Sequence, residues 1–317
     1  MNNRNSQSTN GLALLVVLWV MAILMVTVLS FSFFTRTETN AALVFKESAE
    51  KKFLAEAGVE RAIIEIFYRR QNAANPITLE GAEVWKADGS EYKDHVGDGY
   101  YKVRITGEAG KLDINKASDL LLKDLFLNSG IKEAEADIIV DSLMDWKDPN
   151  GLTRLHGAGS DYYKSLPIPY NIKNASFDSV EEVLLVKGMS PGILYGDGNQ
   201  KGIIDFLTVY SGNSAINLNF APKEVLMAVP GIPADMADAI IQYRNGQPIK
   251  NIQEAVSGNY QQIAPYLTTD EGNIYTIEAE GHRENDRAGY PIKATVIVDS
   301  NNKYRYLYYK SPAYRVK

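Results

Sequence analysis

An uncharged apolar run covers residues 12–34 and follows a polar leader that ends at Gly11. As a helix with a rise of about 1.5 Å per residue, the run extends roughly 35 Å, enough to cross the hydrocarbon layer of a bilayer, which is about 30 Å thick. A cleaved secretory signal is the alternative. The apolar part of such a signal is usually about 7–15 residues long and is followed by a small-residue cleavage pattern, which this sequence lacks. The run therefore predicts a retained membrane anchor that carries a large aqueous domain.

Charge and cysteine content limit what the aqueous part can do. The 317 residues carry a formal net charge of -6, which argues against a nucleic-acid surface that depends on attraction to phosphates. The absence of cysteine excludes disulfides, thiol catalysis and cysteine-based zinc sites. About 280 residues follow the apolar run, which is enough to bury a substantial core in one large or two small domains.

Periodicity divides these residues into three parts. Over residues 35–75, apolar positions recur at steps of three and four, which predicts that the membrane helix continues as an amphipathic helix. Residues 76–112 and 270–317 contain alternating stretches that predict a small antiparallel sheet. In residues 113–269, the periodicity and the turn residues are instead those of helices. We therefore expect an α+β fold in which a long N-terminal helix packs with a small sheet, and a large all-α domain is inserted into that sheet.

The inserted part contains an imperfect duplication. Residues 112–117 (LDINKA) precede a Gly-Ile pair at 130–131, and residues 216–221 (INLNFA) precede a Gly-Ile pair at 231–232. In each copy we expect the asparagine after the strand-like residues to cap the following helix, and the Gly-Ile pair to form a tight turn into a second helix. The duplication predicts two helix-hairpin-helix modules in a SAM-like helical domain.

The second copy resembles the DNA-binding domain of competence receptors, but its turn is poorly suited to phosphate. Phosphate binding needs exposed backbone N–H groups in a Gly-Ile-Gly turn at a helix N-terminus. Pro233, which has no N–H group, replaces the second glycine, and Asp235 and Asp238 follow it. We therefore interpret both copies as packing modules and expect no nucleic-acid partner. A membrane-tethered DNA receptor remains the alternative from a different functional class.

The order of features along the chain resembles the type IV pilins and type II secretion pseudopilins, and within them the K subclass of minor pseudopilins. Gly11 before an apolar helix resembles the class III leader of this family. Most members carry Glu at the fifth mature position, where this chain has Val16. The K subclass also lacks that Glu and has a helical domain inserted into its pilin sheet. Its signature segments resemble residues 54–60, 145–163, 180–189 and 216–219.

The resemblance implies a processing step, a location and partners. A prepilin peptidase would cut the leader, residues 1–11, after Gly11 and methylate the new N-terminus at Leu12. The chain would span the inner membrane once, with its C-terminal domain in the periplasm. It would cap the tip of the pseudopilus shaft together with I- and J-type minor pseudopilins and so drive protein export across the outer membrane. A minor pilin of a type IV pilus is the alternative with the same architecture.

Val16 has its own physical interpretation within this resemblance. In ordinary pilins, the Glu at this position neutralises the terminal ammonium of a neighbouring subunit, because an unpaired charge in lipid is costly. A subunit with Val16 cannot supply that partner, which is tolerable at the end of a filament. The alternative is that Val16 only faces lipid.

An acidic stretch in the inserted part predicts a metal site. Asp145, Asp148, Asn150 and Asp161 supply carboxylate and amide oxygens at the end of a predicted helix and in the loop after it. Calcium prefers about six to eight oxygen ligands in flexible geometry. The K subclass binds calcium in its helical domain, and this loop resembles such a site. Where relatives have Glu this chain has Gly159, and a metal-free Asp-Pro-Asn-Gly turn is the alternative.

No pattern indicates an enzyme. His95, His156 and His282 are scattered and lack the spacing of a metal or catalytic motif, and the glycine-rich segments match neither a phosphate loop nor a dinucleotide fingerprint. The chain also has no Gly-x-Ser-x-Gly elbow. The 19 tyrosines, several of them within residues 304–309, favour a half-exposed sheet or an interface. We therefore expect assembly rather than catalysis.

Overall fold

The structure, a computed structural model, describes residues 9–72, 84–196, 201–256, 260–284, 288–299, 301 and 303–313, with side chains from Leu12 onward. Most of the predicted leader lies outside these residues, as do parts of both predicted sheet segments, including residues 76–83 and 314–317.

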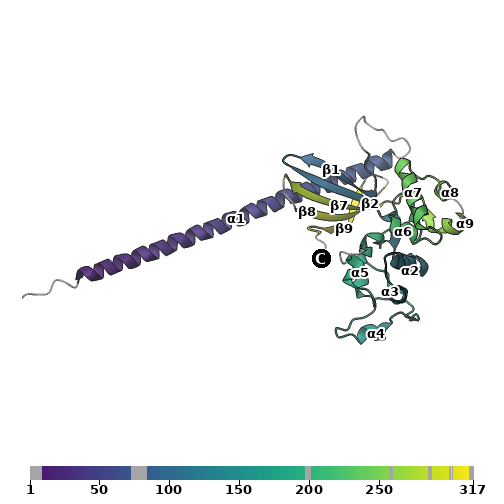
Figure 1. Cartoon of the computed structure of the whole chain (residues 1–317), viewed down its shortest axis with the longest axis horizontal. Helices are drawn as coiled ribbons and strands as arrows, with labels where there is room; N and C mark the ends of the chain where they lie inside the picture. Colours follow the sequence, from purple (N-terminus) through teal and green to yellow (C-terminus); the bar gives the residue numbers. More distant parts are fainter. Residues whose placement is uncertain are drawn as a thin grey trace, which may run out of the picture.

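Helix α1 (Thr9–Gln71) is one continuous rod that unites the predicted membrane helix with the predicted amphipathic helix. Its N-terminal part projects freely from the head, and its C-terminal part lies against a sheet (Figure 1). The helix contains no proline, so nothing in its backbone interrupts the hydrogen-bond ladder. Gly58 lets the rod approach the sheet closely, because a Cβ there would lie 2.9 Å from Cγ2 of Val103.

Five antiparallel strands form the sheet in the order β1-β2-β7-β8-β9. The strands are β1 (Asp88–Val96), β2 (Gly99–Gly107), β7 (Ile274–Arg283), β8 (Tyr290–Val298) and β9 (Tyr304–Lys310). The last four contain the alternating segments that the sequence predicts. Strand β1 shows no such alternation, because Tyr92 is its one buried residue.

The core of this part lies between α1 and one face of the sheet. Val103, Ala279 and Ile292 form one cross-strand row on β2, β7 and β8, and each is at most 2% exposed. From the helix, Ile63 and Ile66 close over this face and are also buried. Each such isoleucine or valine contributes roughly 1.5–3 kcal/mol to folding through burial. The opposite face of the sheet is polar.

The inserted domain leaves the sheet after β2 and returns to it at β7. Its helices and turns surround a separate hydrophobic core that includes Leu122, Phe126, Ile139 and Ile240. The longer α-helices are α2 (Asp119–Asn128), α3 (Glu133–Lys147) and α7 (Ala234–Gly246). The shorter ones are α4 (Ser160–Lys164), α5 (Pro191–Tyr195), α6 (Lys223–Met227), α8 (Ile252–Ala255) and α9 (Tyr260–Ile263). The 3-10 turns are η1 (Glu108–Gly110), η2 (Val180–Leu185), η3 (Ile203–Phe206) and η4 (Ala264–Tyr266).

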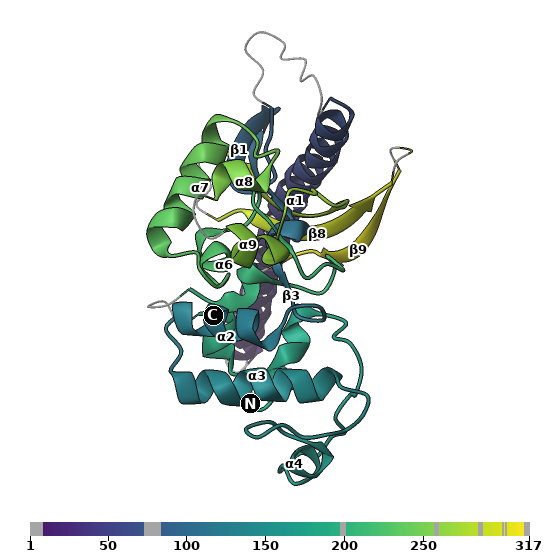
Figure 2. The same cartoon turned by 90° about the vertical axis from the view of Figure 1, so that its right-hand side faces the viewer.

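The view along α1 shows how this domain is arranged (Figure 2). Helices α6 to α9 lie beside the sheet, whereas α2 and α3 lie farther from it and α4 marks the far end of the domain. The inserted domain therefore widens the head on one side of the rod.

The duplication in the sequence is also a duplication in the structure. Strand β3 (Leu112–Asp113) pairs in parallel with β4 (Leu207–Thr208), and β5 (Ile216–Asn217) pairs in parallel with β6 (Leu267–Thr268). In both copies, the residue after the first strand donates its N–H to the carbonyl of the threonine in the partner strand, at 3.0 and 3.1 Å. In each copy, a two-residue parallel ladder therefore joins the first strand to a strand that lies much later in the chain.

The two asparagines at the start of the copies do not cap helices, contrary to the sequence expectation. The N-cap of α2 is Ser118, whose hydroxyl accepts a backbone N–H from the first turn. Asn115 instead bonds both the N–H and the carbonyl of Phe177, at 2.8 and 3.1 Å. Asn219 bonds Ile249 in the same way, at 2.8 and 3.0 Å. Each asparagine therefore fastens a distant loop to the start of its copy.

Phe220 joins the inserted domain to the sheet. It follows β5 in the second copy, yet its side chain belongs to the core between α1 and the sheet. A Cβ on Gly107 or on Gly110 would lie 2.6 Å from atoms of Phe220, so both glycines permit this close contact. The guanidinium carbon of Arg69 lies 5.3 Å from the centre of the Phe220 ring. The two parts of the head thus share one packed junction.

A buried ion pair lies at the same junction. Glu108 of η1 and Lys111 have side chains that are 3% and 8% exposed, and the ammonium donates to the carboxylate. Burial by itself raises the pKa of Glu108. The Lys111 charge and hydrogen bonds from Lys111, Thr208 and Thr276 outweigh burial and lower the pKa below its ordinary value. Because Thr208 lies in β4 and Thr276 in β7, this carboxylate connects the inserted domain with the central strand of the sheet.

Candidate functional site

The apolar side chains of the N-terminal part of helix α1 are exposed. By length and composition, Leu12–Gln71 could cross a membrane, and none of its most apolar window is buried in the structure. Gly11 and Leu12, the predicted processing position, lie in the first turns of α1. Leu12 and Val16 are 70% and 55% exposed. A row of exposed apolar side chains of this length requires either lipid or other helices to cover it.

The four predicted metal ligands are spread over a helix end, a loop and a following helix. Asp145 lies in α3 and is 3% exposed, Asp148 is the C-cap of α3, and Asp161 lies in α4. Asn150 lies in the turn, where its N–H donates to Oδ1 of Asp148 at 2.9 Å. Within the residues that the structure describes, no group of three or more histidine, aspartate or glutamate side chains is arranged to hold a metal ion.

The backbone of the loop satisfies the Asp145 carboxylate. It accepts the N–H of Arg154 at 3.1 and 3.2 Å and the N–H of Ala158 at 3.0 Å. A Cβ on Gly157 would lie 1.8 Å from Oδ2, so the loop closes over the carboxylate only with glycine there. Burial raises the pKa of Asp145, the two backbone donors counteract this, and nearby Asp141 adds to the rise. The described conformation therefore fits a loop held by backbone donors.

The two helix-hairpin-helix turns lead into α3 and α7, which pack in the helical core. Gly130 and Gly231 adopt φ angles of 84° and 92°, which favour glycine. After the turns, Ile139 of α3 and Ile240 of α7 are fully buried in the helical core. At the second turn, Pro233 is the N-cap of α7, and the ammonium of Lys223 is paired with Asp238 at 2.6 Å. This turn presents a proline and acidic groups where a phosphate site needs N–H donors.

Two of the three histidines lie in one cross-strand row, although the sequence places them far apart. His95, Tyr100 and His282 are register partners on β1, β2 and β7. The Tyr100 ring stacks on His282 with centres 4.8 Å apart and lies 5.7 Å from His95. Among the described residues, the ring nitrogens of the buried His282 make no hydrogen bond, although Nε2 lies 3.4 Å from Oε2 of Glu280. The row is thus a packed aromatic stack. His156 lies apart from it, in the loop beside Asp141.

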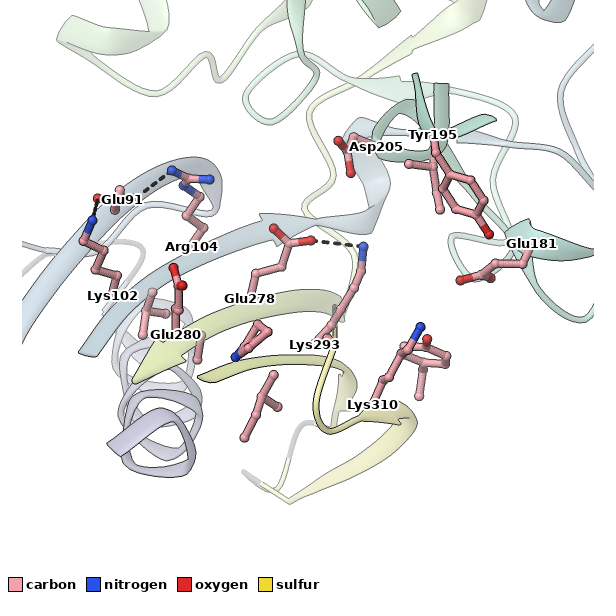
Figure 3. A pocket seen from close by; sticks show the side chains of 17 residues that line it. Glu91, Lys102, Arg104, Glu181, Tyr195, Asp205, Glu278, Glu280, Lys293 and Lys310 are labelled. Carbon is pink, nitrogen blue, oxygen red and sulfur yellow. Dashed lines mark hydrogen bonds and ion pairs between the residues drawn. The ribbon is translucent and has the colours of Figure 1, made fainter. Parts of the chain in front are cut away.

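A groove of about 450 Å³ lies between the polar face of the sheet and the inserted domain. Figure 3 shows Glu278 and Lys293 near its centre, paired at 3.1 Å, and Glu91 paired with Arg104 at 2.6 Å and with Lys102 at 3.7 Å. Burial lowers the pKa of Lys293, but the Glu278 carboxylate outweighs burial and raises it above its ordinary value. The inserted domain contributes Glu181, Tyr195, Ile204 and Asp205 to the lining. Because opposite charges alternate here, the groove offers no uniform field for an anionic polymer.

Comparisons with known proteins agree with this architecture. Residues 105–195 match the family described as type II secretion system (T2SS), protein K, and residues 211–268 match the helix-hairpin-helix motif. The chain is similar to the type II secretion system protein K of Pseudomonas aeruginosa, with 25% identity over 255 residues that cover 74% of this chain and 72% of that protein.

The fold is also similar to that of a solved structure. It resembles a chain in the crystal structure of the GspK-GspI-GspJ complex from the type 2 secretion system of enterotoxigenic Escherichia coli, with a TM-score of 0.57 and 13% identity. The likeness covers 87% of this chain and 98% of that chain, so it extends over most of the fold.

Proposed function

We propose, from the premise that the chain belongs to the protein K family of type II secretion minor pseudopilins, that it caps the tip of the pseudopilus. In this proposal, the apolar part of α1 lies in the inner membrane before assembly and packs among sister helices in the filament. The head lies in the periplasm. The mechanism is assembly rather than reaction.

The observation that carries this proposal is the contrast between the two ends of α1. Its N-terminal part is apolar and uncovered, whereas its C-terminal part is packed against a sheet that bears a large inserted domain. A bundle of such rods buries their apolar surfaces together, but a head widened on one side leaves little room for further subunits above it. A subunit of this shape suits the end of a filament better than its shaft.

The proposed partners are I- and J-type minor pseudopilins. Support comes from the solved complex of a protein with a similar fold, in which GspK is bound to GspI and GspJ. The exposed apolar side chains of α1 supply a surface that such helices can share, because burial of apolar area drives association.

We predict that Gly11→Val abolishes assembly. A branched side chain at the residue before the proposed cut should block the prepilin peptidase, so that the polar leader remains in front of Leu12. Co-expressed with prepilin peptidase and the I- and J-type subunits, the unchanged chain should migrate as a shortened polypeptide and co-purify with both subunits from detergent extracts. The Gly11→Val chain should migrate more slowly and lose both partners.

The matched control is Gly246→Ala, a substitution at a site where a Cβ meets no atom within 4 Å. It should leave processing and co-purification unchanged. Equal mobility of the Gly11→Val chain and the unchanged chain would contradict the processing step. Failure of the unchanged chain to retain either partner would contradict the tip assignment.

Calcium binding by the loop after α3 is a further proposal, which rests on the sequence resemblance. Its support in the structure is that the carboxylates of Asp141 and Asp145 lie one turn apart in the C-terminal half of α3, where the charge of Asp141 helps to raise the pKa of Asp145. We expect calcium to raise the melting temperature of the full chain in detergent by a few degrees, and EGTA to reverse the rise. Asp148→Asn should weaken the response. Identical melting curves with calcium and with EGTA would contradict the proposal.

A further inference from the structure

Strand β9 carries three tyrosines on the face of the sheet that contacts α1. The β8–β9 register shifts between Thr295 and Val296, and this irregularity places Tyr306 and Tyr309 on the same face as Tyr304. The rings of Tyr304 and Tyr306 lie 5.5 Å apart and nearly perpendicular, and those of Tyr306 and Tyr309 lie 5.3 Å apart. All three remain 37–44% exposed. Because β9 is an edge strand, these rings border on solvent beside the rod.

The hydroxyls of two of these tyrosines converge on one carboxylate of α1. Tyr304 lies 3.3 Å from both oxygens of Glu60, and Tyr306 lies 3.3 Å from Oε1. Burial raises the pKa of both tyrosines, and the negative charge of Glu60 raises it further. Both phenols donate to the Glu60 carboxylate.

Glu60 differs from its neighbours on α1 because no cation of the described chain pairs with it. In the same stretch of the helix, four other glutamates have a lysine or arginine nitrogen within 3.8 Å: Glu47, Glu50, Glu56 and Glu65. Glu60 has two phenol donors and no such nitrogen among the described residues. Its charge is thus held in place without being neutralised.

Apolar side chains flank this carboxylate on the same face of the helix. Phe53 precedes Glu60 by seven residues and Ile64 follows it by four, so all three share one face of α1. Phe53 and Ile64 are 66% and 56% exposed. A fixed, unpaired charge between exposed apolar and aromatic side chains matches the composition of protein interfaces, where aromatic residues are enriched. We call this surface, formed by Phe53, Glu60, Ile64, Tyr304 and Tyr306, the tyrosine–glutamate face.

We propose that the tyrosine–glutamate face binds an arginine side chain of a neighbouring minor pseudopilin. A guanidinium group can donate to the two carboxylate oxygens of Glu60 and lie against the face of one of the two tyrosine rings. The face lies on α1, the element that packs against other subunits in the proposed filament, so the contact would continue that interface into the head. This inference rests on the proposed function and names the chemistry of one of its contacts.

The test uses the full chain co-expressed with prepilin peptidase and the I- and J-type subunits and purified in detergent. Glu60→Arg places like charges together, and the yield of the three-subunit complex should fall about tenfold or more. Glu60→Gln and Tyr306→Phe each remove less of the site and should give smaller losses. The matched control is Glu56→Gln, one turn earlier, whose charge is paired with Lys52 within the chain; it should leave the yield unchanged. Equal melting temperatures of the free variants exclude a folding defect.

A photocrosslinking amino acid at Ile64 identifies the occupant directly. Benzoylphenylalanine there should link to a peptide of the I- or J-type subunit that contains an arginine, and changing that arginine to glutamate should restore binding to the Glu60→Arg chain. If the unchanged chain forms the complex and Glu60→Arg forms it equally well, this inference is wrong while the proposed function stands. If the unchanged chain forms no complex, both are wrong. Crosslinks only to a second copy of this chain, or only to an exported protein, overturn this inference as well.

Discussion

Replacing Gly281 by valine should separate α1 from the sheet and lower the free energy of unfolding of the head by about 3 kcal/mol, the upper end of the usual cost of overpacking. A Cβ on Gly281 would lie 2.0 Å from the carbonyl oxygen of Lys51 and 2.5 Å from the backbone nitrogen of Ala55. Both atoms belong to the backbone of α1, so no side-chain rotation can relieve the overlap. Since β7 is the middle strand of the sheet, a displaced helix would open the core on both sides of it.

The measurement is urea denaturation of the detergent-solubilised full chain, followed by tryptophan fluorescence. Trp85 reports on this core, because it is 8% exposed and stacks on Tyr92 with ring centres 4.7 Å apart. Limited proteolysis of the Gly281→Val chain should also cut within residues 47–72, which the sheet no longer protects. Gly246→Ala should change the free energy of unfolding by less than about 0.5 kcal/mol. A Gly281→Val chain that unfolds at the same urea concentration as the unchanged chain would contradict the observed packing.

The parts of the fold that the sequence predicts are those in which the signal is local. The rod shows a continuous helical period, and the four alternating strands each have one face against α1, so both appear in short windows of sequence. Strand β1 cannot be predicted from a short stretch of sequence, because one buried tyrosine among nine residues gives no alternation. The parallel pairs β3–β4 and β5–β6 cannot be predicted in this way either, because a strand of two residues has no detectable periodicity.

The contacts that sequence reasoning missed join residues far apart in the chain. Asn115 and Asn219 have the residue type of a helix cap, but each bonds a loop 62 or 30 residues away. Glu60 meets Tyr304 across 244 residues, and the irregular β8–β9 register that aligns the tyrosines has no sequence signature. The tyrosine count alone indicates an interface, but it does not identify the carboxylate at its centre.

The acidic loop after α3 shows why residue types alone do not predict a metal site. Asp145 has the right chemistry for calcium, but its oxygens also suit the backbone donors of Arg154 and Ala158, and residue type alone cannot separate the two uses. The glycine at position 157 is the clue in the sequence, because a loop that closes on a carboxylate through N–H groups needs that space.

Replacing Glu108 by alanine should destabilise the head by about 3–5 kcal/mol, because it leaves the Lys111 ammonium buried without its partner. It would also remove the acceptor that connects Thr208 of the inserted domain with Thr276 of the sheet. The matched control is Glu91→Ala, which breaks a pair with Arg104 whose side chains are 40% and 53% exposed. Such exposed pairs contribute about 0–1 kcal/mol. Similar losses in the two variants would contradict the structural role of the junction.

The pH dependence of stability gives a second, independent signature of the same carboxylate. The pKa of Glu108 is lower in the folded chain than in the unfolded one, so its contribution is fully present above the unfolded value, about 4.3, and is lost as pH falls through the lower folded value. Urea denaturation from pH 7 to pH 3 should therefore show a smaller loss for Glu108→Gln than for the unchanged chain. The double variant Glu108→Leu, Lys111→Met should also lack the part of the pH dependence that comes from Glu108. At pH 7 it should nevertheless be more stable than Glu108→Ala and close to the unchanged chain, because an apolar pair leaves no buried charge. If the double variant is as unstable as Glu108→Ala, the loss comes from packing or from the threonine bonds, and the ion pair does not control the junction.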